Sequence, residues 1–188
     1  MQFLIDGHRD RVTFRKAQWA EGVAGQLLTP LTSYRLGHKV FAIDNGAFTR
    51  LRKNAFARMV MRYAHLNPLF VAIPDKLGCH RTTAELYEEH KSIALDCVKA
   101  FVAQDGYTEH PACAGAIFIG GTDKFKDSME ALELVSQARK KGLHVHVGRV
   151  NGPDRFWRFH RAGAHTCDGS GVSRYDHMIL AIKDRADA

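Results

Sequence analysis

The sequence lacks the features that mark several specialised classes of protein. Its four cysteines are widely scattered and form no Cys-x-x-Cys pair, which argues against a disulfide framework and a local zinc finger. No apolar run approaches the roughly 18 residues that a membrane span needs. The first residues turn charged at once, so we expect no signal peptide, no membrane partner and a cytoplasmic location.

What remains is the composition of an ordinary globular protein. The chain has 188 residues, of which 45% are hydrophobic and 25% charged, and this predicts a single domain over residues 1–188. Lys and Arg outnumber Asp and Glu by 27 to 20, giving a net charge of +7. Because a basic surface gains from releasing the counterions condensed on phosphates, the charge favours a polyanionic partner.

Short apolar runs alternate with longer amphipathic ones along the chain. The runs predict strands at 3–5, 40–43, 69–73, 100–103, 115–119, 143–147 and 164–167. The amphipathic stretches predict helices over 82–99, 127–140, 154–161 and 175–183. This alternation is typical of a parallel sheet covered by helices, either a doubly wound open sheet or a (β/α) barrel. We predict an α/β, TIM-like barrel of about seven to eight parallel strands, trimmed or incomplete because a full barrel takes roughly 250 residues.

Polar residues follow the predicted strands. In both architectures the chemistry lies at the carboxyl ends of the strands, where this sequence places Asp44, Asp75, Gln104, Gly120, Gly121 and Asp168. Cleaving a glycosidic bond with retention needs one carboxylate as nucleophile and a second group for proton transfer. An Asp and a Gln can read the amide edge of a purine, and glycines let backbone N–H groups approach a flat ring. The set therefore predicts chemistry at an anomeric carbon.

The same segments resemble the motifs of the tRNA-guanine transglycosylases, in order and in approximate spacing over about two thirds of the chain. Asp44-Asn45-Gly46-Ala47-Phe48 is similar to their Asp-Ser-Gly-Gly-Phe/Tyr, and Ala116-Ile117-Phe118-Ile119-Gly120-Gly121 to their Ala-Ile-Gly-Gly. Four further segments resemble family motifs in the same way: residues 73–75, 101–106, 147–154 and 162–168.

The resemblance implies an activity and its catalytic residues. Asp168 would be the nucleophile that attacks C1′ of the target nucleotide and forms a covalent glycosyl-aspartate intermediate, and Asp44 would be the general acid/base. Guanine would leave and a 7-deazaguanine, 7-cyano-7-deazaguanine or a derivative, would enter. The exchange itself needs no metal, and we expect no cofactor. It implies these residues for binding the base: Asp75 and Gln104 at its hydrogen-bonding edge, Gly120 and Gly121 through backbone N–H groups, Phe48 by stacking, and Val147 where the family often has Met.

The departures from the family pattern suggest which branch this chain is closest to. The family's zinc motif, Cys-x-Cys-x-x-Cys with a distant His, is missing, and Gly-Ser-Gly at 169–171 replaces Pro-Thr-Arg after the nucleophile. A minimal, basic, zinc-free chain is closest in character to the phage-type DNA-guanine transglycosylases. The implied partners are DNA, with tRNA less favoured, and a free 7-deazaguanine base. A homodimer or a partner subunit is also compatible with so short a barrel, and a phage protein would act in the host cytoplasm.

Basic residues on loops that leave the same rim suggest phosphate contacts. We predict a nucleic-acid-binding surface of Arg50, Arg52, Lys53, Lys124, Arg149 and Arg174.

Two alternatives use the same residues differently. His144 and His146 alternate on one predicted strand and point to the same side, so with Asp168 they could bind the metal of a barrel hydrolase. In the opposite register, Val145 and Val147 would face the barrel and the histidines would pack under helices. The chain could also be a non-catalytic DNA-binding subunit of a modification complex that keeps the barrel and the basic rim.

Overall fold

The computed structural model describes residues 1–47, 51–94 and 96–185. Its strands form a closed parallel barrel in which each strand pairs with its neighbours in chain order and β1 pairs with β8. The strands are β1 (Gln2–Asp6), β2 (Val23–Leu28), β3 (Phe41–Ile43), β4 (Val71–Ala72), β5 (Lys99–Ala103), β6 (Ala116–Ile119), β7 (His144–Val147) and β8 (Thr166–Cys167). The predicted TIM-like architecture is thus confirmed, and the eighth strand belongs to this chain.

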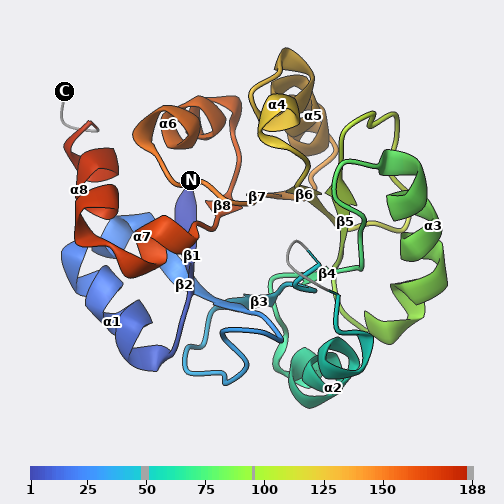
Figure 1. Ribbon diagram of the computed structural model, residues 1–188, viewed down its shortest axis with the longest axis horizontal. Helices are drawn as coiled ribbons and strands as arrows, with labels where there is room; N and C mark the ends of the chain where they lie inside the picture. Colours follow the sequence, from blue (N-terminus) through green and yellow to red (C-terminus); the bar gives the residue numbers. More distant parts are fainter. Residues whose placement is uncertain (48–50, 95, 186–188) are drawn as a thin grey trace.

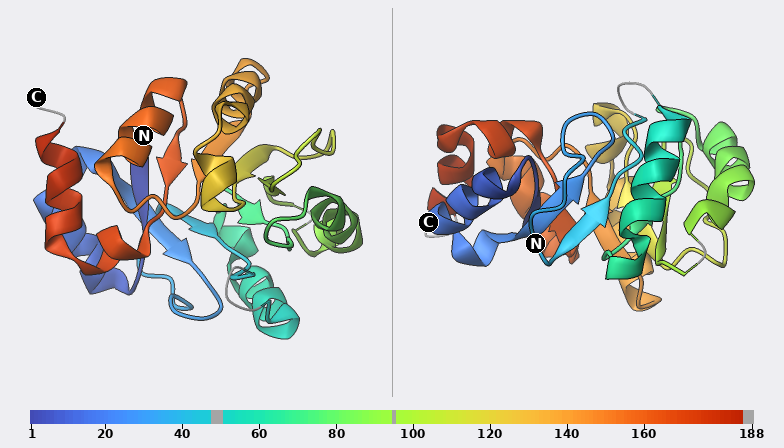
Figure 2. Two further views of the ribbon diagram at one scale, coloured as in Figure 1. Left: turned by 45° about the horizontal axis from the view of Figure 1, so that its top comes forward. Right: turned by 90° about the horizontal axis from the view of Figure 1, so that it is seen from below.

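Helices surround the barrel, as Figure 1 shows in a view that looks onto the ring of strands. They are α1 (Arg9–Gln18), α2 (Lys53–Tyr63), α3 (His80–His90), α4 (Asp123–Lys126), α5 (Met129–Lys140), α6 (Pro153–Ala162), α7 (Ser170–Arg174) and α8 (Asp176–Asp184), with 3-10 turns η1 (Ala20–Gly22), η2 (Ala64–Leu66) and η3 (Lys91–Ala94). None of these helices is long and apolar enough to cross a membrane. The chain is short for this fold partly because residues 29–40 connect β2 to β3 without a helix (Figure 2).

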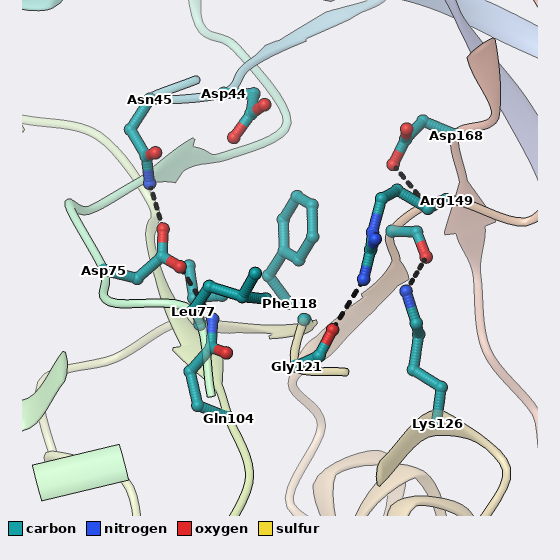
Figure 3. A pocket seen from close by; sticks show the side chains of 13 residues that line it. Asp44, Asn45, Asp75, Leu77, Gln104, Phe118, Gly121, Lys126, Arg149 and Asp168 are labelled. Carbon is teal, nitrogen blue, oxygen red and sulfur yellow. Dashed lines mark hydrogen bonds between the residues drawn. The ribbon is translucent and has the colours of Figure 1, made fainter. Parts of the chain in front are cut away.

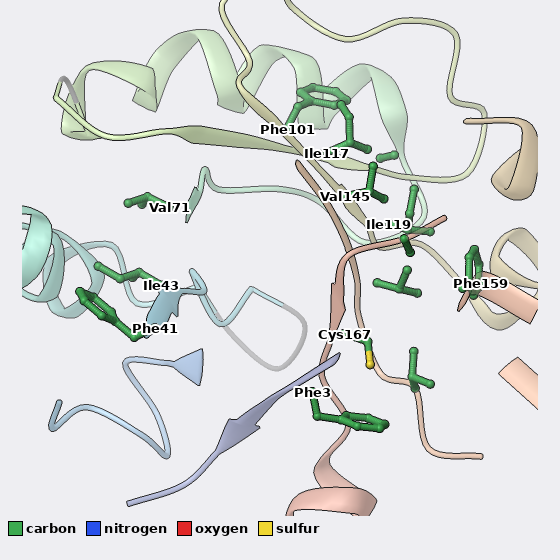
Figure 4. Packing of buried hydrophobic residues seen from close by; sticks show 14 of the residues in the cluster. Phe3, Phe41, Ile43, Val71, Phe101, Ile117, Ile119, Val145, Phe159 and Cys167 are labelled. Atoms are coloured by element: carbon green, nitrogen blue, oxygen red, sulfur yellow. The ribbon is translucent and has the colours of Figure 1, made fainter. Parts of the chain in front are cut away.

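Side chains alternate along each strand between two buried layers. On β6, Ile117 and Ile119 pack in the larger cluster between the barrel and its helices (Figure 4). Ala116 and Phe118 point the other way, into a smaller cluster that fills the barrel interior. Because both faces are buried, the strands appear in the sequence as continuous apolar runs.

The sequence does not predict β2, because Gly25 and Gln26 interrupt its apolar run. The structure explains both residues. A Cβ added at Gly25 would lie 2.0 Å from the Val40 carbonyl oxygen, so only glycine allows this close approach of the two chain segments. Gln26 is fully buried, and its amide nitrogen donates to the carbonyl oxygens of Gly7 and Arg35 at 2.8 and 2.9 Å. It thereby fixes the loop that replaces the missing helix.

The helix predictions succeed in part. The predicted ranges overlap α5, α6 and α8 closely, and the range 82–99 covers most of α3 but runs past its end at His90 to the first residue of β5, whereas α1 and α2 are missed. Along α1 only Val12 and Arg15 are buried, so its sequence carries almost no apolar periodicity.

Candidate functional site

A pocket opens at the carboxyl ends of the strands, with an empty volume of about 480 Å³ that includes its solvent-open mouth (Figure 3). Asp44, Asp75, Gln104, Gly120, Gly121 and Asp168, which the sequence predicts to lie at one rim, all line it. The remaining lining residues are Asn45, Leu77, Val102, Phe118, Lys126, Gly148 and Arg149. Leu77, Val102 and Phe118 give the pocket apolar surface of the kind on which a flat ring can lie.

Two amides hold Asp75 in place. The Asn45 side chain donates to Asp75 Oδ1 at 2.8 Å, and Gln104 Nε2 donates to Asp75 Oδ2 at 2.6 Å. Each amide is itself anchored, since Asn45 Oδ1 accepts from the Ala47 N–H and Gln104 Oε1 accepts from the Gly78 N–H. Burial raises the pKa of Asp75 to about 6 against the lowering effect of these amide donors. Asp75 is thus ionised at neutral pH and presents a fixed acceptor to the pocket.

Asp44 lies beside this network in a different electrostatic state. Burial, and then the negative charges of Asp168 and Asp75, raise its pKa to about 8 from an ordinary 3.8. Hydrogen bonds from the backbone N–H groups of Gly46 and Asn45 oppose the rise. At neutral pH Asp44 therefore carries a proton, whereas Asp75 does not.

Asp168 receives two donors on one carboxylate oxygen. His146 Nε2 lies 3.1 Å and the Arg149 backbone nitrogen 3.2 Å from Asp168 Oδ1. The His146 ring is fully buried inside the barrel, and its Nδ1 lies 2.9 Å from the Thr166 hydroxyl. These contacts fix the orientation of the carboxylate while the side chain keeps 15% of its surface exposed.

Two cationic side chains line the pocket between β6 and β8. Lys126 of α4 is fully buried, and its Nζ donates to the Gly148 carbonyl oxygen at 3.2 Å. Burial, with the nearby charges of Arg149 and Arg155, lowers the pKa of Lys126 to about 8. Arg149 Nη2 donates to the Gly121 carbonyl oxygen at 2.7 Å. Arg149 also has a φ of 58°, a conformation that L residues rarely adopt and that tends to mark functional sites.

The two glycines after β6 differ in what they offer a ligand. The Gly120 N–H donates to the Ala103 carbonyl oxygen at 3.0 Å within the barrel, so the prediction that it donates to a base is wrong. Among the described residues, none accepts a hydrogen bond from the Gly121 N–H. Gly121 has a φ of +73°, and a Cβ there would lie 2.6 Å from the Phe125 ring, so both conformation and space require glycine.

The structure places Val147 outside the pocket. Its side chain belongs to the cluster between barrel and helices, since the histidines of β7 are the ones that point inward. The prediction that Val147 contacts the base is therefore wrong, and so is the register that turns Val145 and Val147 toward the barrel. Phe48, predicted to stack on the base, and Arg50, predicted to bind phosphate, lie outside the described residues.

The other predicted phosphate-binding residues lie in or next to helices that follow the barrel strands β3, β6 and β8. Arg52 precedes α2, Lys124 is in α4 and Arg174 ends α7, and all three are exposed. Lys53 is exposed as well, but its Nζ pairs with Glu89 of α3 at 3.2 Å. Arg149 differs from these residues because its guanidinium is held against the pocket.

The histidines of β7 contact a threonine hydroxyl and do not form a set of free metal ligands. His144 Nε2 and His146 Nδ1 both lie 2.9 Å from the Thr166 hydroxyl, and the other nitrogen of His146 faces Asp168. Within residues 1–47, 51–94 and 96–185, no group of three or more His, Cys, Asp or Glu side chains is arranged to hold a metal ion.

Sequence reasoning does not assign Asn45, Phe118 or Lys126 to the site, and it considers His146 only as a metal ligand. Asn45 directly follows Asp44, and Phe118 lies near the end of a predicted strand, two residues before Gly120, so their positions carried a usable signal. Lys126 carries none, because it looks like one of many helical lysines. Asp6, at the end of β1, is a further rim carboxylate, and burial raises its pKa with a smaller contribution from Asp168.

Comparisons with known proteins add little to this geometry. No family model and no curated protein matches the chain. A solved structure titled "PaMucR Phosphodiesterase, c-di-GMP complex" is similar over 88% of this chain and 73% of that one, with 13% identity and a TM-score of 0.38. A likeness this distant carries no argument about activity.

Proposed function

We propose that the protein is a guanine transglycosylase that exchanges guanine in nucleic acid, preferably DNA, for a free 7-deazaguanine base. One observation carries the proposal: carboxylates from the ends of β3, β4 and β8 line a single pocket in which one is protonated and another is held as a fixed acceptor. Pairs of titratable groups whose surroundings separate their pKa values are the usual sign of an acid and its partner.

Recognition of the base follows from the Asp75 network. Guanine carries an N1–H and an N2 amino group on one edge, which are donors that an ionised carboxylate accepts. Asn45 and Gln104 hold both oxygens of Asp75, so this acceptor is positioned before the base arrives. The Gly121 N–H, on the next strand end, is suited to donate to the O6 oxygen.

The chemistry then needs only Asp168 and Asp44. Asp168 attacks C1′, a C1′–O bond forms, and the C1′–N9 bond breaks with its electron pair passing to the base. Asp44, protonated at neutral pH, gives its proton to the departing guanine. The incoming base loses its N9 proton to Asp44 and attacks C1′, which releases Asp168. The step is an exchange, so it consumes no energy source.

The polyanionic substrate agrees with the net charge of +7 and with the exposed Arg52, Lys124 and Arg174 at the rim. The preference for DNA over tRNA rests on the family resemblance and on the missing zinc motif. Inside a duplex the target guanine is stacked, so the nucleotide must be flipped out to reach Asp168.

A base-exchange assay tests the proposal. Purified protein is incubated with DNA, or separately with tRNA, containing labelled guanine, together with unlabelled 7-deazaguanine bases. We expect release of label from DNA and loss of at least about 10³-fold in rate for Asp168→Asn, which removes the nucleophile. Asp184→Asn, a matched change of an exposed carboxylate at the end of α8, should leave the rate unchanged.

Each result of that assay has a distinct meaning. Release from tRNA alone would keep the chemistry and overturn the choice of DNA. Exchange at the normal rate by Asp168→Asn would overturn the assignment of the nucleophile, and no release from either substrate would overturn the activity.

A further inference from the structure

The pocket has a cationic wall that the proposed exchange chemistry does not use. Lys126 and Arg149 both line the pocket, on the opposite side from Asp75 (Figure 3). Within the part of the chain that the structure describes, Lys126 Nζ donates one hydrogen bond, to the Gly148 carbonyl oxygen at 3.2 Å. The carboxylate nearest to it, Asp123, is 3.9 Å away with a side chain that is 70% exposed, so solvent weakens this ion pair. Asp168 also attracts this charge, but burial and the charges of Arg149 and Arg155 outweigh the two carboxylates, so the positive charge of Lys126 is only partly compensated.

The order of the strands decides which part of a bound base faces this wall. Following the rim, Asp75 follows β4, Gly121 follows β6, Arg149 follows β7 and Asp168 follows β8. Going round guanine from the N1–H and N2 donors, O6 comes next, then position 7, and then N9. With the donor edge on Asp75, O6 on the Gly121 N–H and N9 directed at Asp168, position 7 faces the arc from β6 to β8, where Lys126 and Arg149 lie.

We propose that Lys126, assisted by Arg149, selects 7-deazaguanines whose group at position 7 is an uncharged hydrogen-bond acceptor, such as a nitrile or carboxamide, and excludes a positively charged aminomethyl group. This inference rests on the proposed function, because that function sets the orientation of the base. A second cation brought beside a buried ammonium is repelled strongly where water is scarce. A nitrile or carbonyl accepts a hydrogen bond from the same ammonium.

The electrostatics of the free pocket agree with this assignment. Burial and two neighbouring arginines already lower the pKa of Lys126 to about 8, so the charged form of this side chain is disfavoured even in the free pocket. Adding a further positive charge at position 7 is correspondingly unfavourable.

The experiment compares two incoming bases, 7-cyano-7-deazaguanine and 7-aminomethyl-7-deazaguanine, in the exchange assay and in direct binding of the free bases to the whole protein. For the wild type we expect a preference of about thirtyfold or more for the nitrile, the size expected for repulsion between partly solvated charges. Lys126→Met removes the charge at nearly constant shape, and we expect it to lower the preference about tenfold while Arg149 maintains the remainder.

Lys140→Met is the matched control, because Lys140 is exposed at the far end of α5. This variant should keep the wild-type preference. Equal use of the two bases by the wild type, or an unchanged preference in Lys126→Met, would overturn the inference and leave the transglycosylase proposal standing. Failure of both bases to bind and to exchange would overturn the proposed function and the inference together. Direct binding gives the preference between the two bases even for a variant that exchanges them slowly.

Discussion

The two sides of the pocket bury ionisable groups of opposite charge. On the side of β3 to β5, acids are buried together, and two anchored amides stabilise Asp75 while Asp44 keeps its proton. On the side of β6 to β8, a lysine is buried with arginines near it, and a backbone carbonyl oxygen is its close acceptor. In both cases burial moves the pKa toward the neutral form. The charge state of this pocket is therefore set by burial as much as by residue type.

The most damaging change to the acidic side is Asp44→Asn. On the proposed mechanism it removes the proton donor for the leaving base, and we expect the exchange rate to fall about 10²- to 10³-fold. Because the pKa of Asp44 is raised to about 8, the acid form persists up to that pH, and kcat/KM of the wild type should fall as pH rises above 8. A pH–rate profile checks this, since the variant should lack that limb. A wild-type rate that stays level well above pH 8 would contradict the role.

The corresponding change on the basic side, Lys126→Met, should raise stability. The pKa of Lys126 is about 8 in the folded protein against an ordinary 10.5, so the charged side chain destabilises the fold at pH 7 by about 3 kcal/mol. This penalty is full below pH 8, shrinks as pH rises from 8 to 10.5, and vanishes above. Denaturant unfolding of both proteins should therefore show a difference at pH 7 that closes by about pH 10.5. A variant less stable than the wild type at pH 7 would contradict this picture.

The smallest expected effect concerns the positioning of Asp168. His146→Leu removes the donor to Asp168 Oδ1, and we expect kcat to fall about tenfold with KM little changed, because the histidine does not line the pocket. The change His177→Leu, at an exposed position of α8, serves as the control. An equal loss in both variants, or a loss confined to KM, would speak against positioning. The two variants together show whether the basic side of the pocket orients the nucleophile.

Much of the fold could be predicted because most strands are buried on both faces. Seven of the strands appear as apolar runs, and this pattern alone was enough to place the polar residues that follow them at one rim. Strand β2 could not be predicted, because Gln26 interrupts its pattern and is explained only by acceptors on loops elsewhere in the chain. Helix α1 could not be predicted either, because its buried face is too narrow to leave a periodic signal.

The site was predicted unevenly for a related reason. Asp44, Asp75, Gln104, Gly121 and Asp168 end or follow strands, and strand order alone brings them together. Val147 was misplaced because a strand buried on both faces does not reveal which of its alternating residues point inward. The same ambiguity concealed the inward position of His146.

The barrel and the groups at its rim can be predicted from the amino-acid sequence alone, because apolar periodicity and strand-end residues are local properties. Three properties arise only in the folded chain: Asp44 holds a proton, two amides hold Asp75, and a buried Lys126 faces the pocket. These properties depend on distance and on exclusion of water among residues far apart in the chain. No local pattern encodes them, because a carboxylate or an ammonium has the same sequence signature in water as it has in a pocket.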